Sequence, residues 1–287
     1  MQLYLALAIP ILIGTAWLFT AQITRGSLPN LRNKCICLLI AHPDDEAMFF
    51  SPTVLALTAP EAGNHVKILC LSSGNADGLG ETRKNELAAS ASMLGLRSAS
   101  DVLVIEDSKF QDSMKATWSA ASIAQLLSSA FSPTTNTPSK NTSSEPTATI
   151  DTLITFDRHG ISSHPNHISL YHGAKQWLAS LMNGKSGWKS PIELYTLTTT
   201  SIIRKYISLL DAPITMFVGA NRTAGMSKKK TREEPPTLIY ISDFAQWWRG
   251  LNAMVNGHKS QMRWFRWGWV GVGRYMVVND LRRETVT

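Results

Sequence analysis

The chain has 287 residues, of which 44% are hydrophobic and 17% charged, and its formal net charge is +7. This length suits one sizeable domain with an appendage, and the composition excludes a largely disordered chain. The three cysteines, Cys35, Cys37 and Cys70, are odd in number and lie in apolar runs, which favours buried thiols in a reducing compartment over a disulfide framework.

The first predicted element is a membrane anchor over residues 1–26. The stretch 3–24 carries no charged side chain, and the first one is Arg25. About 20 such residues can cross a hydrocarbon core of ~30 Å. A cleaved signal peptide is the alternative, but it normally opens with basic residues, whereas here the basic residues follow the apolar run. The pattern therefore predicts a single-pass transmembrane helix that leaves the rest of the chain in the cytosol.

Residues 33–220 are predicted to form an α/β core. Short apolar runs alternate with stretches of helical pattern, and the runs lie at residues 35–41, 66–72, 101–105, 152–156 and 192–197. Strands that are apolar on both faces and alternate with helices indicate a Rossmann-like, mostly parallel sheet flanked by helices. No Gly-x-Gly-x-x-Gly follows any of these runs, so we expect no dinucleotide. The Ser/Thr/Pro-rich stretch 132–149 is predicted to be a disordered insertion.

The C-terminal segment, residues 221–287, carries the whole excess of positive charge. From Arg222 onward there are 12 Lys and Arg against 5 Asp and Glu, interleaved with tryptophan in "QWWRG" and "RWFRWGWVGVGR". This mixture suits the headgroup layer of a membrane. The alternatives are a helical layer that closes the core and, less favoured, stacking on single-stranded nucleic acid. We expect a basic, Trp-rich helical segment that contacts the core and the membrane surface, with no nucleic acid as partner.

The hexapeptide "AHPDDE", residues 41–46, follows the first apolar run directly. Proline is favoured at the first position of a helix, so Asp44, Asp45 and Glu46 are expected in a first helical turn. Acids there complement the helix dipole, but this explanation does not account for His42. Ligands in parallel α/β folds bind at the carboxyl ends of the strands, where this hexapeptide is predicted to lie.

A second motif, "HPNH" at residues 164–167, follows the fourth apolar run in the same way. The ends of parallel strands converge, so His42, Asp45, His164 and His167 are expected to meet. Two imidazoles and one carboxylate leave an open coordination position, as in hydrolytic zinc sites. A lone His-x-x-His is more often a packed or capping pair, but the two motifs together predict a metal site.

"AHPDDE" together with "HPNH" resembles the LmbE-like, PIG-L superfamily of zinc-dependent N-deacetylases. The resemblance covers roughly residues 35–280, apart from the insertion. It implies Zn2+, or another divalent metal, bound by three ligands, with a general base and an oxyanion-stabilising histidine beside it. By the same resemblance the ligands are His42, Asp45 and His167, the base is Asp44, and the oxyanion histidine is His164.

Three further residues are assigned around this predicted centre. Glu46 is expected to support a ligand from behind, and the resemblance gives Arg83 a contact to the inositol side of a substrate. Asp112, in the loop after the third strand, is expected to contact a sugar hydroxyl. The other histidines, among them His258, are expected to be ordinary surface or packed side chains.

The segments outside the motifs resemble the family members that act on N-acetylglucosaminyl-phosphatidylinositol in GPI-anchor biosynthesis. They include "VKILCLSSGNADGLGETRKNELAASASMLGL" and "HKSQMRWFRWGWVGVGRYM". This resemblance implies a glycolipid substrate and a single-pass protein of the endoplasmic reticulum membrane with its catalytic domain facing the cytosol. Two alternatives stay open: a deacetylase of another N-acetylated glycoconjugate, and a catalytically inactive glycolipid-binding subunit.

Overall fold

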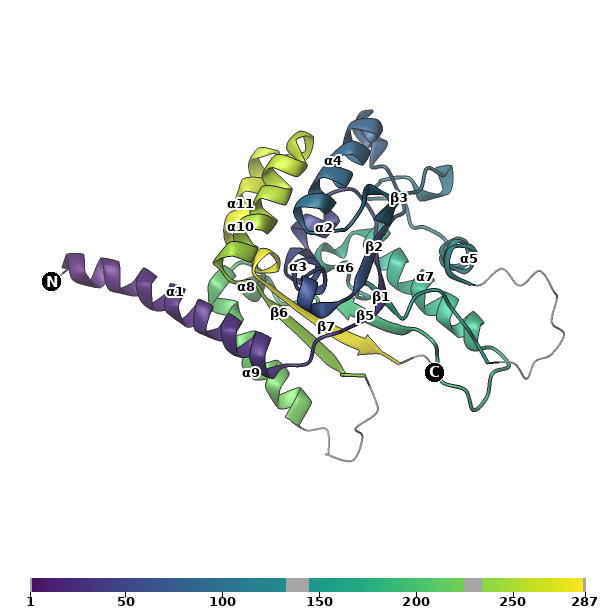
Figure 1. The fold of residues 1–287 in the computed structure, drawn as a ribbon. Helices are drawn as coiled ribbons and strands as arrows, with labels where there is room; N and C mark the ends of the chain where they lie inside the picture. Colours follow the sequence, from purple (N-terminus) through teal and green to yellow (C-terminus); the bar gives the residue numbers. More distant parts are fainter. Residues whose placement is uncertain (1, 133–144, 225–233, 286–287) are drawn as a thin grey trace.

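The computed structural model describes residues 2–132, 145–224 and 234–285. Most of the predicted disordered insertion, residues 133–144, lies outside this range. The described chain forms an α/β domain from which one long N-terminal helix extends (Figure 1).

Within the described residues the strands form one sheet in the order β3-β2-β1-β4-β5-β7-β6. The strands are β1 (Cys35–Ile40), β2 (His65–Cys70), β3 (Val102–Val104), β4 (Thr152–Phe156), β5 (Glu193–Leu197), β6 (Thr237–Ile241) and β7 (Val278–Glu284). The first five run parallel, and β7 pairs antiparallel with β5 and β6. The predicted mostly parallel sheet is confirmed. Its central strands are buried on both faces, which explains their continuous apolar sequence.

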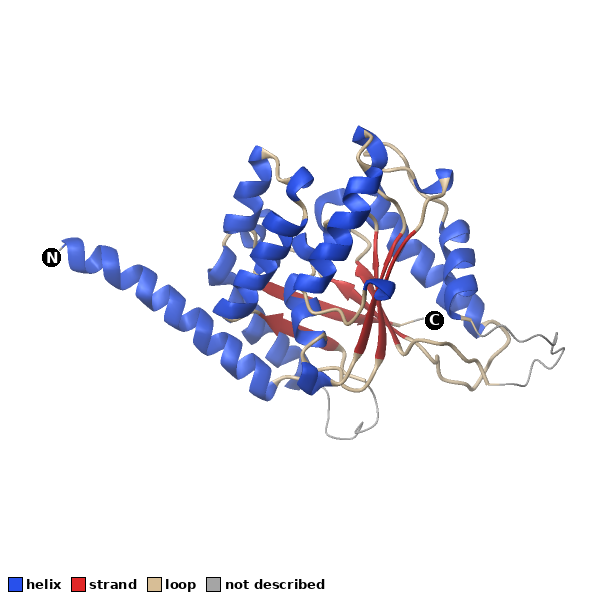
Figure 2. Cartoon of the chain, turned by 45° about the horizontal axis from the view of Figure 1, so that its top comes forward, coloured by secondary structure: helices blue, strands red, loops and turns tan. Residues whose placement is uncertain are grey.

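Helices cover both faces of this sheet (Figures 1 and 2). One face carries α5 (Ala120–Phe131) and α7 (Pro165–Met182), which pack against each other. The opposite face carries α2 (Asp45–Met48), α3 (Ser51–Leu57), α4 (Gly80–Met93), α10 (Phe244–Asn252) and α11 (Trp264–Val272). The short helices α6 (Gly160–Ser163) and α8 (Ile202–Lys205) follow β4 and β5, and α9 (Asp211–Ala224) packs beside β6.

The N-terminal helix α1 (Gln2–Ser27) docks on the domain by its C-terminal half. Trp17 is buried there, and its indole N–H donates to the carbonyl oxygen of Ser242 at 2.8 Å. The predicted helix is confirmed, but the predicted transmembrane span is not. Among the residues that the structure describes, no helix is both long enough and apolar enough to cross a membrane.

The C-terminal segment contributes more than the predicted helical layer, because β6 and β7 extend the sheet. The three cysteines are free thiols, as expected. Cys37 and Cys70 are buried, whereas Cys35, the first residue of β1, is exposed, so burial of all three was a wrong expectation. Cys35 is exposed because the strand begins there, at the end of the sheet.

Candidate metal-dependent active site

A cavity of about 520 Å³ opens where β1 and β4 end. Its walls come from both histidine motifs, from the loops after β2 and β3, and from α11. Of the eight residues that the sequence analysis selected, all except Glu46 line it: His42, Asp44, Asp45, Arg83, Asp112, His164 and His167. The parallel strands therefore bring the two motifs together, as their positions predict.

His42, Asp45 and His167 offer one ligand atom each within 4.8 Å of one another, and all three side chains are buried. The Asp45 carboxylate is oriented by the backbone, because Oδ2 accepts the N–H groups of Ala41 at 3.0 Å and His42 at 2.9 Å. Its other oxygen, Oδ1, lies 3.3 Å from Nε2 of His167. That Nε2 atom is buried and has no hydrogen-bond partner among the described residues.

In each of the two imidazoles, one ring nitrogen is hydrogen-bonded to a residue outside the ligand set. Nδ1 of His167 lies 3.1 Å from the carbonyl oxygen of Gly160, and Nε2 of His42 lies 3.1 Å from Oδ1 of Asn166. Both partners are acceptors, so each of these nitrogens carries the proton and the opposite nitrogen offers a lone pair. Histidine ligands of metals are oriented in this way. The donor set fits a divalent ion that takes nitrogen and oxygen ligands.

The pKa values reflect a cation-binding centre. Burial lowers the pKa of His42. Burial also opposes the charged form of His167, but the Asp45 carboxylate beside it outweighs this and raises the His167 pKa. Burial alone would raise the pKa of Asp45, yet the His167 charge holds it below its ordinary value. The Asp45 carboxylate thus favours positive charge at this position.

Asp44 lies beside the ligand set in a strained backbone conformation. Its φ of 118° is in the left-handed region, which non-glycine residues rarely adopt. Its Oδ2 atom forms an ion pair with Nη1 of Arg266 at 2.6 Å and lies 3.7 Å from Nη2 of Arg83. Strain of this kind persists where the surroundings hold a functional side chain in place. The carboxylate lines the same cavity as the three ligand residues but does not belong to their set.

His164 caps the N-terminus of α7 and faces the cavity. The backbone N–H of Asn166 donates to its Nδ1 at 3.2 Å, so the proton of the neutral ring is on Nε2. Burial, and then the neighbouring rings of His167 and His42, lower its pKa to about 4. At neutral pH the ring is uncharged and offers an Nε2–H donor.

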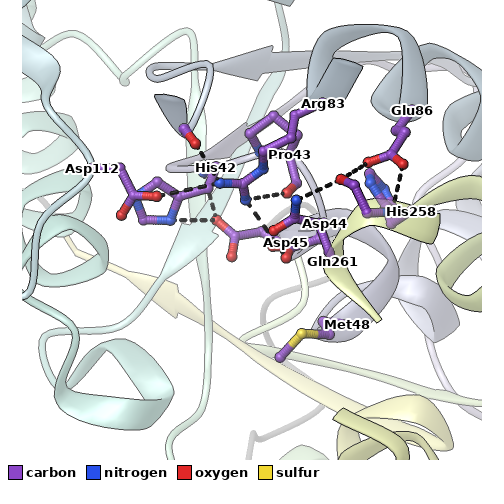
Figure 3. A network of polar contacts seen from close by, with 12 residues as sticks. His42, Pro43, Asp44, Asp45, Met48, Arg83, Glu86, Asp112, His258 and Gln261 are labelled. Carbon is purple, nitrogen blue, oxygen red and sulfur yellow. Dashed lines mark hydrogen bonds and ion pairs between the residues drawn. The ribbon is translucent and has the colours of Figure 1, made fainter. Parts of the chain in front are cut away.

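Arg83 is buried, and its guanidinium joins the loops around the site (Figure 3). Nη1 donates to the carbonyl oxygen of Gly74 at 2.7 Å, and Nη2 donates to that of Pro43 at 2.8 Å. Asp112 bridges Arg83 and His42, at 3.3 Å and 3.2 Å. These contacts give both residues a supporting position, and their predicted contacts to substrate stay predictions.

Glu46 is fully buried behind the cavity, and it contacts Asp44 rather than a ligand side chain. Its Oε2 accepts the backbone N–H of Asp44 at 3.1 Å, and its Oε1 lies 2.6 Å from Nε2 of His258. His258, expected to be an ordinary surface or packed side chain, is a packed one, and it is fully buried against this acid. The "HKSQ" segment that carries His258 was noted for its resemblance to the family, and that was the available signal.

Arg266 is another residue of the site that the sequence analysis did not select. It lies on α11, within the Trp-rich run, and lines the cavity. The signal in the sequence was an arginine among aromatic residues, which also describes a membrane-facing or solvated side chain. The C-terminal segment thus supplies one wall of the site.

Comparisons with known proteins show which proteins the chain resembles. The profile of the PIG-L family, described as GlcNAc-PI de-N-acetylase, matches residues 37–178. The N-acetylglucosaminyl-phosphatidylinositol de-N-acetylase of Arthroderma benhamiae is 50% identical, over 99% of this chain and 98% of its own. That of Saccharomyces cerevisiae is 33% identical, over 85% and 80%. Among solved structures, an N,N'-diacetylchitobiose deacetylase from Pyrococcus horikoshii, 16% identical, aligns with a TM-score of 0.53 over 96% of this chain and 91% of its own. This last likeness concerns the fold.

Proposed function

Because the chain belongs to the PIG-L family, we propose that it hydrolyses the N-acetyl group of N-acetylglucosaminyl-phosphatidylinositol. Water and the amide give glucosaminyl-phosphatidylinositol and acetate, the second step of GPI-anchor biosynthesis. The observation that carries this proposal is the cluster of His42, Asp45 and His167, with the Asp44 carboxylate beside it in the cavity. An amide is a poor electrophile and water a poor nucleophile, so the site has to activate both.

The residues divide this work. Zn2+ held by His42, Asp45 and His167 would supply a Lewis acid that acidifies water and polarises the acetyl carbonyl. Asp44 accepts the proton of the attacking water at its carboxylate and then delivers it to the nitrogen of the leaving amine. His164 donates its Nε2–H to the carbonyl oxygen as negative charge develops there. Its low pKa supports this role, because the donor stays neutral and in one tautomer at physiological pH.

We also propose that the protein works on the cytosolic face of the endoplasmic reticulum membrane. Most of the exposed large hydrophobic side chains among the described residues lie on α1, α8, α9, α10 and α11. They include Trp264, which is 85% exposed, and Ile202, which is 72% exposed. Exposed apolar patches of this kind, mixed with arginines, suit contact with lipid.

Some of these helices contact one another. Trp17 of α1 contacts Trp247 of α10, with ring centroids 6.5 Å apart, and Tyr206 beside α8 contacts Trp269 of α11 at 6.0 Å. Phe265 of α11 is exposed and also lines the cavity. The arrangement favours a substrate whose sugar enters the cavity while its acyl chains stay in the membrane.

The test of the reaction is acetate release from N-acetylglucosaminyl-phosphatidylinositol by the purified chain. We expect release to stop on chelation and to return on addition of Zn2+. A water-soluble N-acetylglucosaminyl-inositol without acyl chains is the comparison substrate. No release from folded, metal-loaded protein would refute the proposal, and preference for the soluble compound would indicate another glycoconjugate.

The membrane proposal has its own test. Binding to vesicles that contain phosphatidylinositol should weaken in a triple variant in which Trp264, Phe265 and Trp267 are all replaced by Ser. Replacement of Trp188, an exposed tryptophan on the loop between α7 and β5, is the matched control and should have no effect. Equal binding of both variants would contradict a membrane contact through α11.

A further inference from the structure

A buried chain of polar contacts links the C-terminal segment to the backbone of Asp44. His258 and Glu46 are both fully buried, and Nε2 of His258 lies 2.6 Å from Oε1 of Glu46. The hydroxyl of Ser90 on α4 donates to the same oxygen. The other carboxylate oxygen accepts the backbone N–H of Asp44 at 3.1 Å. Every oxygen of this buried acid thus has a donor, as burial of a charged group requires.

These polar contacts end at Asp44, whose φ of 118° is in the left-handed region. A non-glycine residue holds such a conformation only when neighbouring groups determine it. The hydrogen bond from its N–H to Glu46 fixes the peptide group on which that conformation depends. The carboxylate of Asp44 is then directed between Arg266 and the metal set.

The part of the chain that carries His258 is itself held firmly on α4. His258 follows the π-helical turn η6 (Ala253–Gly257), and a Cβ atom built on Gly257 would lie 3.0 Å from Cβ of Ser90. Ser260 makes a second connection, because its N–H and its hydroxyl donate to the carboxylate of Glu86 at 2.7 Å and 2.6 Å. Figure 3 shows Glu86 and His258 on this side of the network. The imidazole therefore has a rigid support.

We propose that His258 is a positioning residue for Asp44: it holds the Glu46 carboxylate where it accepts the Asp44 N–H, and so keeps the base in its strained, productive orientation. This inference rests on the proposed function, in which Asp44 is the base. The proposal separates the base from the metal ligands, because the metal ligands are held by other hydrogen bonds. Asp45 is held by the N–H groups of Ala41 and His42, and His167 by Gly160. Loss of His258 should therefore impair the base and spare the metal.

The test compares His258→Leu with His258→Gln in the full-length protein. Leucine removes the donor to Glu46, whereas the glutamine amide restores an N–H at a similar distance from the backbone. Misplacement of a catalytic group by about 1 Å costs on the order of 10²-fold in rate. We therefore expect His258→Leu to lower kcat about 10- to 100-fold, with KM and the Kd for Zn2+ unchanged, and His258→Gln to recover most of kcat. His172→Leu, on an exposed position of α7, is the matched control.

The Asp44→Asn background separates positioning from a general structural role. If His258 acts through Asp44, His258→Leu should lower the residual activity of Asp44→Asn no further, because residues that act as a unit are not additive. An equal loss in both backgrounds, or a loss of zinc affinity in His258→Leu, would overturn the inference.

A crystal structure of His258→Leu gives a readout independent of turnover. We expect Asp44 to leave the left-handed region, while His42, Asp45 and His167 keep their positions. An unchanged Asp44 would overturn the inference even if the wild-type protein deacetylates the glycolipid. Conversely, a displaced Asp44 in a protein with no activity on this glycolipid would refute only the proposed function.

Discussion

Nη1 of Arg266 lies 2.6 Å from Oδ2 of Asp44, so the last α-helix of the described residues contacts the first motif in the cavity. The Arg266 side chain is only 19% exposed, whereas its neighbours Trp264 and Phe265 are 85% and 55% exposed. One short helix therefore directs a cation at the base and presents aromatic rings outward. If α11 rests on a membrane, as we propose, the same contact sets the position of a residue in the active site.

Replacement of Arg266 by Met should affect both activity and stability. The change leaves the Asp44 carboxylate without its nearest cation, and removal of one partner from a buried interaction typically costs about 1–3 kcal/mol. We expect that loss in urea unfolding, together with a lower kcat. Arg263→Met is the control for stability, because Arg263 pairs with Asp77 at an exposed site, where ion pairs contribute ~0–1 kcal/mol. A similar loss of unfolding free energy in both variants would show that the Asp44 contact is unimportant for stability.

Asp44→Asn should separate metal binding from catalysis. The amide keeps the size of the side chain but cannot accept the proton of water, and general base catalysis typically contributes about 10²–10⁴-fold. We expect kcat to fall by that factor while one equivalent of Zn2+ stays bound, as measured by metal analysis of the purified variant. Near wild-type turnover would remove Asp44 from its proposed role.

His164→Gln tests the oxyanion donor and its pKa. Loss of one such donor typically costs about 10²–10³-fold in kcat. Because the His164 pKa is lowered to about 4, the wild-type ring is neutral from pH 5 upward and should not contribute an acid limb near pH 6.5. The pH profiles of kcat/KM for the two proteins should therefore run parallel between about pH 6 and 8. An acid limb near 6.5 that disappears in the variant would contradict a neutral donor.

Gly74 and Gly78 allow a matched test of the support around Arg83. Both have positive φ, 66° and 73°, so alanine at either position costs about 1–2 kcal/mol in backbone strain. A Cβ atom at Gly74 would lie 2.0 Å from Nη1 of Arg83, whereas one at Gly78 meets nothing within 4 Å. We expect Gly74→Ala to lose an additional ~1–3 kcal/mol and to impair activity. Equal urea midpoints for the two variants would show that Arg83 moves aside freely.

His258 should make unfolding free energy depend on pH. Burial lowers its pKa, but the charge of Glu46, with Asp44 and Glu86 also near, outweighs this and raises it above the ordinary 6.5. A raised pKa means that the stabilisation is complete below pH 6.5 and is lost as pH rises through the folded-state value. The stability difference between wild type and His258→Gln, measured by urea unfolding in chelator, should shrink from pH 6 to pH 9. A difference that grows with pH would contradict a charged His258.

The parallel part of the sheet and the meeting of the two motifs were accessible from the sequence. Apolar runs such as the one over residues 35–41 report burial on both faces, and parallel strands place their carboxyl ends along one edge. His42 and His167 could therefore be brought together without coordinates. The additional strands β6 and β7 were not predicted, because short apolar runs in a basic, aromatic segment resemble the buried face of a helix equally well.

The sequence by itself determined which residue types meet at the cavity. Local patterns place each motif at the end of a strand, and parallel strands bring these ends to one edge of the sheet. Only the tertiary structure decided what surrounds them. Arg266 and His258 reach Asp44 and Glu46 through the packing of α11 and η6 on the domain, and no local pattern encodes a contact between opposite ends of a chain. The docking of α1 depends likewise on the surface that Trp17 meets, so the length and apolarity of the helix alone could not predict it.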